Sequence, residues 1–154
     1  MKNNLEQQIL EFNLLYKRYD NIYRRAARKF DMCELEFMIL YVLRSFNPEK
    51  SRCAQKDLSQ ILMHPKQSIN SALKSLLQKG LVRLTPSSDN QRVKYIYLTE
   101  KGMQLAERTA DILIGAERKA FCSMTEEERE TLLSLFGKLT GLIDEQFCQI
   151  RGSR

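Results

Sequence analysis

The hydrophobic period of the sequence changes at Gly80, and this change limits the possible folds more than any other feature. Before it, the apolar residues of PKQSINSALKSLLQK (65–79) recur at helical spacing. After it, LVRL (81–84) and VKYIYL (93–98) alternate between apolar and polar residues, and the segment TPSSDNQ between them is rich in turn formers. The pattern predicts a helix that ends at a glycine and is followed directly by a β-hairpin.

Three helical segments are predicted before this unit. Apolar and aromatic residues at steps of three and four run through residues 5–23, which is typical of a long amphipathic helix. Residues 34–46 are apolar on nearly all sides and indicate a buried central helix that ends before Pro48. Residues 54–62 predict a short helix, and Pro65 is expected at the first position of the helix that follows.

Two helical segments are predicted after the hairpin. Thr99 is expected to cap a helix over residues 100–121, and Thr125 with Glu128 has the spacing of a capping box that opens a last amphipathic helix. The predicted fold class is therefore mainly α with a small β-hairpin wing.

Helix, short helix, tight turn, helix and hairpin is the order of a winged helix-turn-helix. In such a motif the second helix enters the major groove of DNA, and the hairpin reaches the adjoining backbone or minor groove. The charge pattern agrees, because residues 44–94 hold ten Lys and Arg against three Asp and Glu, a local charge of +7 in a chain of net charge +6. This excess favours a polyanionic partner.

The sequence resembles the MarR family of bacterial transcription regulators. The resemblance rests on QKDLSQIL before the turn, on SINSALKSLLQKGLVRL for the second motif helix and first wing strand, and on DNQRVKYIYLTEKG for the wing and the next helix start. It implies one MarR-like protomer over residues 1–154, with a winged helix-turn-helix lobe over 33–98 flanked by dimerisation helices over 1–30 and 100–150. It also implies a homodimer that binds a pseudo-palindromic operator in double-stranded DNA, usually as a repressor released by a small-molecule effector or an oxidant.

The candidate DNA-contacting residues are polar and basic side chains of the motif helices and the hairpin. Asn70 suits the edge of an adenine, and Arg92, beside the loop, is placed to enter the minor groove. Two departures from the family pattern are Asn90, where an Asp is common, and Ser71, where an Arg is frequent. The solvated face of a surface helix is the alternative for the helix residues, and the order of the motifs favours DNA contact. The full set is Lys56, Lys66, Gln67, Ser68, Asn70, Ser71, Lys74, Arg83, Arg92 and Lys94.

The four cysteines do not indicate a metal site, because they lack a C-x-x-C spacing and only one histidine accompanies them. Reduced and mostly buried thiols are expected, and no cofactor. Cys33 leaves a redox-sensing regulator open as an alternative. It lies at the predicted start of a helix, where unpaired amides favour a thiolate, while Glu34 and Glu36 oppose it.

Other functional classes find little support. The sequence has no glycine-rich phosphate loop, Ser-His-Asp set or paired-carboxylate pattern, so we do not expect an enzyme. It has no run of 18 apolar residues and no signal-peptide pattern, which favours the cytoplasm and no membrane contact. The competing function is a protein-interaction dimer, such as an antirepressor with a degenerate wing, although the basic segment 44–94 argues against it.

Overall fold

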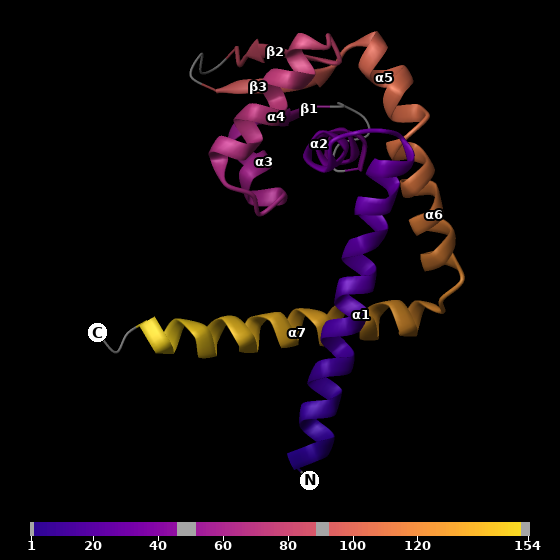
Figure 1. Cartoon of the computed structure of the whole chain (residues 1–154), viewed down its shortest axis with the longest axis vertical. Helices are drawn as coiled ribbons and strands as arrows, with labels where there is room; N and C mark the ends of the chain where they lie inside the picture. Colours follow the sequence, from indigo (N-terminus) through magenta and orange to yellow (C-terminus); the bar gives the residue numbers. More distant parts are fainter. Residues whose placement is uncertain (1, 46–51, 89–92, 152–154) are drawn as a thin grey trace. The chain divides into compact units, whose positions relative to one another are not determined.

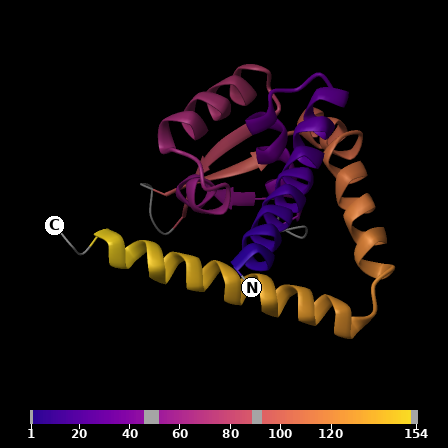
Figure 2. The same ribbon diagram turned by 60° about the horizontal axis from the view of Figure 1, so that its bottom comes forward.

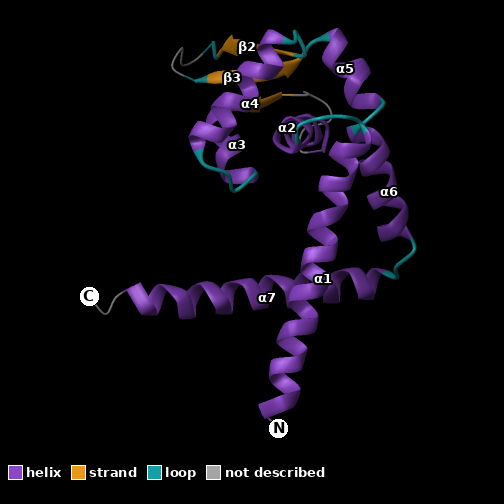
Figure 3. Ribbon diagram, viewed as in Figure 1, coloured by secondary structure: helices purple, strands orange, loops and turns teal. Residues whose placement is uncertain are grey.

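A computed structural model describes residues 2–45, 52–88 and 93–151 (Figure 1). The contacts divide the chain into two units, Met1–Ile114 and Gly115–Arg154. The elements in chain order are α1 (Lys2–Lys29), α2 (Glu34–Ser45), β1 (Arg52–Ala54), α3 (Gln55–Ile61), α4 (Lys66–Gln78), β2 (Val82–Pro86), β3 (Lys94–Leu98), α5 (Glu100–Glu107), α6 (Ala110–Cys122) and α7 (Glu126–Arg151). Figure 3 shows the predominance of helix, and the predicted fold class is confirmed.

The three strands form an antiparallel sheet in the order β1-β3-β2. The predicted hairpin is present, with Val82 opposite Leu98 and Pro86 opposite Lys94, and its strands lie side by side in both Figure 1 and Figure 2. Strand β1 was not predicted. It has only three residues, too few for a period of two to be recognised, and it exists through its pairing with β3.

The core of the first unit forms around α2, as the apolar sequence of that segment predicts. Its large apolar side chains are fully buried with one leucine of α3, the inner face of α4 and one isoleucine of β3. These side chains are Phe37, Ile39, Leu40, Leu43, Leu58, Ile69, Leu73, Leu76 and Ile96.

The end of α4, the base of the hairpin and the start of α5 meet in one hydrogen-bonded junction. Gly80 has φ +66°, and the backbone N–H of Leu81 donates to the carbonyl of Leu76 at 2.9 Å, which closes the helix as a Schellman motif. Thr99 caps α5 by accepting from the Gly102 N–H at 3.0 Å. The Thr99 hydroxyl also donates to the Gly80 carbonyl at 2.7 Å. The predicted roles of Gly80 and Thr99 are confirmed.

Two predicted helix bounds need correction. The single helix over 100–121 is in fact α5 and α6, separated at Arg108 and Thr109. The buried Thr109 hydroxyl donates to the Leu105 carbonyl at 2.7 Å, and such bonding by Ser or Thr competes with helical bonding. Pro65 is the N-cap residue of α4 rather than its first helical residue.

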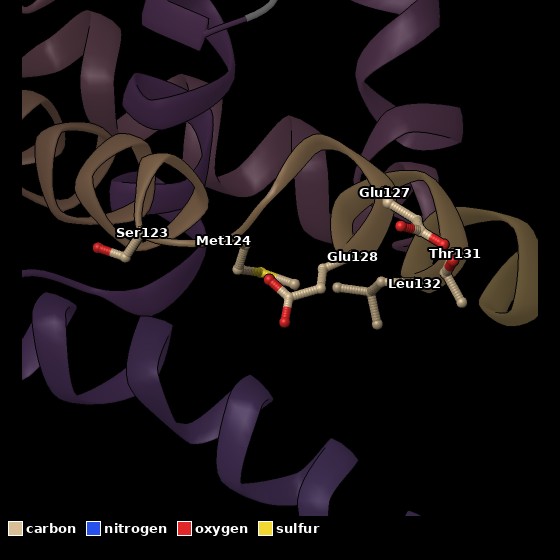
Figure 4. A pocket seen from close by; sticks show the side chains of 6 residues that line it. All are labelled: Ser123, Met124, Glu127, Glu128, Thr131 and Leu132. Carbon is tan, nitrogen blue, oxygen red and sulfur yellow. The ribbon is translucent and has the colours of Figure 1, made fainter.

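The second unit contains the capping box predicted from its sequence. Thr125 N–H donates to a carboxylate oxygen of Glu128 at 2.8 Å, and Glu128 N–H donates to the Thr125 hydroxyl at 3.2 Å. Figure 4 shows the side chains that line a pocket at this helix start. The residues that line the pocket are Ser123, Met124, Glu127, Glu128, Thr131 and Leu132.

Gly102 is fixed by close approach of backbone, so we expect Gly102→Ala to destabilise the protein. A Cβ at this position would lie 1.8 Å from the Leu81 carbonyl oxygen, an atom that already accepts from the Thr99 N–H at 3.0 Å. Forcing the two apart should lower the free energy of unfolding by about 3 kcal/mol. Urea unfolding followed by circular dichroism measures this value.

Gly115→Ala is the matched control, because a Cβ at Gly115 in α6 would meet no atom within 4 Å. Alanine is the better helix former, so this change should leave stability unchanged or raise it by up to about 1 kcal/mol. Equal effects of the two substitutions would show that the Leu81 contact does not constrain residue 102.

Candidate DNA-binding site

Helix α4 divides sharply into a buried face and an exposed face. Ile69, Ala72, Leu73 and Leu76 are buried against the core. The residues predicted to contact DNA all lie on the exposed side, and these are Lys66, Gln67, Ser68, Asn70, Ser71 and Lys74. The helical period thus turns every candidate of α4 toward solvent.

A buried charge helps to fix α4 on α2. Glu36 is 5% exposed although it is charged. The Lys79 ammonium, at the end of α4, lies 2.6 and 2.9 Å from its two carboxylate oxygens. Without Lys79 the Glu36 carboxylate would stay buried and unpaired, which is costly. The ion pair therefore holds the C-terminal end of α4 against α2.

One groove brings together four of the predicted residues from three elements. It is lined by residues of α3, α4 and the start of β3, namely Gln55, Lys56, Lys66, Asn70, Val93 and Lys94. In the described part of the chain no ion pair involves its three lysines. The groove therefore combines three uncompensated positive charges with two carboxamides, a combination suited to a polyanion with polar edges.

A second groove lies along α4 and is formed with the start of α2. Gln67, Ser68 and Ser71 line it together with Cys33 and Leu35. The Ser71 hydroxyl donates to the Gln67 carbonyl of its own helix at 3.1 Å. Lys74 is exposed and lines neither of these two grooves. Five of the six predicted residues of α4 thus divide between two depressions.

The structure does not bring Arg83 into the lysine-lined groove. Val82 and Leu84 point inward with Ile96 and Leu98, so Arg83 lies on the outer face of the sheet. Its guanidinium stacks 4.5 Å from the centroid of the Tyr97 ring and donates to the Thr85 hydroxyl at 2.9 Å. Lys94 lies on the opposite face of the hairpin. The other wing candidate, Arg92, falls outside the described residues, as does Asn90.

Gln55 is a groove residue that sequence reasoning missed. Its side-chain N–H donates to Oδ1 of Asn70, at a distance of 3.2 Å. Its position next to Lys56 in the sequence is the only local indication that Gln55 lies in the groove. The contact to Asn70, 15 residues away, depends on how α3 and α4 pack.

Comparison with known proteins supports the resemblance to the MarR family. Residues 31–92 match the model of the MarR family. The match covers 62 of the 154 residues and confirms the resemblance over that segment. The curated proteins similar to this chain include the HTH-type transcriptional regulator PecS of Dickeya dadantii, 27% identical over 78% of this chain and 72% of that protein. The HTH-type transcriptional repressor IacR of Pseudomonas putida is 26% identical over 77% of this chain and 68% of its own length.

Two solved structures share the fold. NMB1585, a MarR family regulator from Neisseria meningitidis, has a TM-score of 0.77 at 18% identity and covers 92% of this chain and 97% of its own. MepR of S. aureus in its DNA-binding conformation has a TM-score of 0.71 at 20% identity, over 86% and 98% of the two chains. The curated proteins and solved structures that this chain resembles are named as regulators rather than enzymes.

The cysteines of this protein are not mostly buried, and that expectation is wrong. Cys33, Cys122 and Cys148 are exposed. Cys33 lies in the link before α2, while Cys122 and Cys148 lie on α6 and α7 outside the core. Only Cys53 is partly buried, and burial, followed by the charge of Asp57, raises the pKa of its thiol to about 11.

The described residues contain no group of three or more His, Cys, Asp or Glu side chains that could hold a metal ion. Within the same ranges, no helix combines the length and apolar character that crossing a membrane requires.

Alkylation should separate Cys33 from Cys53. Because the thiolate is the nucleophile, a pKa of about 11 leaves only about one thousandth of Cys53 reactive at pH 8, and its reaction should quicken as the pH rises toward 11. Exposed Cys33 should be modified much faster. Brief iodoacetamide treatment of the folded protein, followed by peptide mass spectrometry, measures both, and denatured protein is the control. Equal modification of the two thiols under native conditions would contradict the burial of Cys53.

Proposed function

We propose that this protein is a sequence-specific DNA-binding transcription regulator that acts as a homodimer on a pseudo-palindromic operator. The observation that carries the proposal is the lysine-lined groove between α3, α4 and β3, beside the exposed polar face of α4. An α-helix with its side chains is about 10–12 Å wide and the major groove of B-DNA is about 12 Å wide, so α4 can insert with its exposed face toward the bases.

The side chains of the site suit two different tasks. Lys56, Lys66, Lys74 and Lys94 carry exposed ammonium groups that suit phosphates, which position a protein on DNA without reading its sequence. The shorter polar groups of α4 suit base edges, where sequence is read. These are Gln67, Ser68, Asn70 and Ser71.

The two wing arginines are assigned different roles. Arg92 is proposed to enter the minor groove, because the sequence places it beside the hairpin loop. Arg83 pairs with Tyr97, three strand positions from the pair that closes the described hairpin, Pro86 and Lys94. At about 3.3 Å per residue it lies about 10 Å from that pair. We therefore assign Arg83 a supporting role on the outer face of the sheet.

A homodimer is supported by apolar side chains that remain exposed on the long helices. Side chains so large and so many rarely stay in contact with water in a monomer. On α1 they include Leu5, Ile9, Leu14, Tyr16 and Tyr19, and on α7 Leu132, Leu135, Leu142, Ile143 and Phe147. Pairing through a two-fold axis would also present two copies of α4 to the two halves of a palindrome.

Repression with release by a small molecule is the proposed mode of action. The similar protein IacR is named a transcriptional repressor, and release by a small molecule rests on the family resemblance. Transcription from the promoter upstream of its own gene, with and without the purified protein, tests the direction of regulation.

Salt dependence tests the groove as a phosphate-binding surface. Six to ten phosphate contacts per dimer would give a slope of log K against log salt concentration of about −5 to −9. Changing Lys56, Lys66 and Lys94 together to Gln removes up to six of these contacts per dimer, so the slope should become less steep by about 5. Fluorescence anisotropy with a selected operator measures the slope.

The control for this experiment replaces Lys17, Lys119 and Lys138, three exposed lysines that line neither groove of α4, with Gln. The net charge changes equally in the two variants. An equal fall in slope for both would show that total charge acts rather than the groove. Absence of any selected sequence for the unmodified protein would favour the antirepressor alternative.

Sedimentation equilibrium at micromolar concentration should give twice the chain mass of 18.1 kDa. Ile143→Glu places a charge among the exposed apolar side chains of α7 and should weaken the dimer at least tenfold. Ser134→Glu, an exposed polar position of the same helix, is the control and should not. A folded monomer of the unmodified protein would contradict the homodimer.

A further inference from the structure

Two carboxamide side chains meet in the lysine-lined groove. Nε2 of Gln55, the first residue of α3, lies 3.2 Å from Oδ1 of Asn70 on α4 and donates a hydrogen bond to it. Both side chains line the groove beside Lys56, Lys66 and Lys94. The sequence predicted Asn70 as a base-reading residue and gave no role to Gln55.

The backbone of Gln55 is held on both sides. The preceding residue, Ala54, is 6% exposed and pairs with Tyr95 in the sheet. Three residues further on, Leu58 is fully buried in the core. Strand β1 and helix α3 therefore fix the point from which the Gln55 side chain reaches Asn70.

The hydrogen bond ties the orientation of the Asn70 carboxamide to that of the Gln55 carboxamide, and in the structure Gln55 is the donor. A free Asn side chain can exchange the positions of its oxygen and nitrogen by rotation, because the two ends have the same shape. Donation from Gln55 holds Oδ1 toward α3 and directs Nδ2 away from it. Within the described ranges neither amide has another hydrogen bond, so both Nδ2 hydrogens and the second lone pair of Oδ1 remain available.

The available donor and acceptor of Asn70 match the major-groove edge of adenine. In the major groove adenine presents an acceptor, N7, beside a donor, the N6 amino group. Asn70 can donate to N7 from Nδ2 and accept from N6 at Oδ1 while Oδ1 also accepts from Gln55. With the carboxamide reversed, the donor Nδ2 would face the N6 amino group, which is also a donor. The acceptor Oδ1 would face N7, which is also an acceptor.

We propose that Gln55 is a positioning residue that fixes the Asn70 carboxamide in the orientation that recognises adenine in the major groove. The proposal rests on the DNA-binding function proposed above and adds a residue of α3 to its specificity. Gln55 acts through Asn70, so its contribution is confined to the one base position in each half-site that Asn70 contacts.

Selection from a library of randomised operators, with the full-length protein, tests the proposal. The variants are Gln55→Met, which keeps the length of the side chain without its amide, Asn70→Ala, and the two combined. Gln55→Met should reduce the preference for adenine by about 2- to 10-fold at the position that Asn70→Ala affects, the range expected for one hydrogen bond. The double variant should show no loss beyond that of Asn70→Ala, because the two residues act as one unit.

Gln60→Met is the matched control, since Gln60 is an exposed glutamine of the same helix and does not line the groove. It should leave every base preference unchanged. Gln55→Glu supplies a different readout. A carboxylate cannot donate to Oδ1 but accepts from Nδ2, so it should reverse the Asn70 carboxamide and shift the selected base away from adenine. A purely structural role for Gln55 predicts no such shift.

Wild-type base preferences in Gln55→Met, or an equal loss of affinity for all sequences, would overturn the proposal. Further loss in the double variant, or the same change in Gln60→Met, would do so too. If Gln55→Met does not fold, as judged by its thermal unfolding, Gln55→Glu decides the question. If the unmodified protein selects no sequence, the DNA-binding function itself is wrong, and this failure differs from one in which a motif is selected but Gln55 does not affect it.

Discussion

Burial of α2 is the constraint on which the first unit depends. Phe37, Ile39, Leu40 and Leu43 are inaccessible to solvent, and burying four such side chains contributes on the order of 10 kcal/mol. A helix that is apolar all round needs cover on several sides, so α4 must turn its own apolar face toward it. The polar face of α4 then has only solvent, or a partner, to contact. Core packing therefore determines which side chains of α4 are available to contact a partner.

Local sequence predicted the elements whose signals are local. Gly80 and Thr99 act within a few residues of their own position, so the end of α4 and the start of α5 could be read directly. Strand β1 could not, because its three residues are stabilised by pairing with β3, more than 40 positions further along. The separation of α5 from α6 was also missed, since it depends on the backbone bonding of one buried threonine, Thr109.

The candidate site was predictable to a similar extent. Helical spacing separates the exposed residues of α4 from the buried ones, and all six were placed correctly on the exposed side. Spacing does not tell which side chains of other elements lie beside them. Arg83 and Lys94 looked equivalent in the sequence, yet the alternation of the strands sends them to opposite faces of the sheet. The partner of Asn70 was hidden for the same reason, because it comes from another helix.

The junction of α4, the hairpin and α5 separates the positions that hold the scaffold from those that face outward. Its bonds are made by backbone groups and by the side chains of Thr99 and Lys101, and its close contact requires Gly102. None of the six exposed candidates of α4 takes part in these bonds. A gene duplicate could therefore exchange the outward-facing side chains one by one while the protein remains folded. In evolutionary terms, the arrangement allows the surface chemistry of this lobe to diverge at little cost in stability.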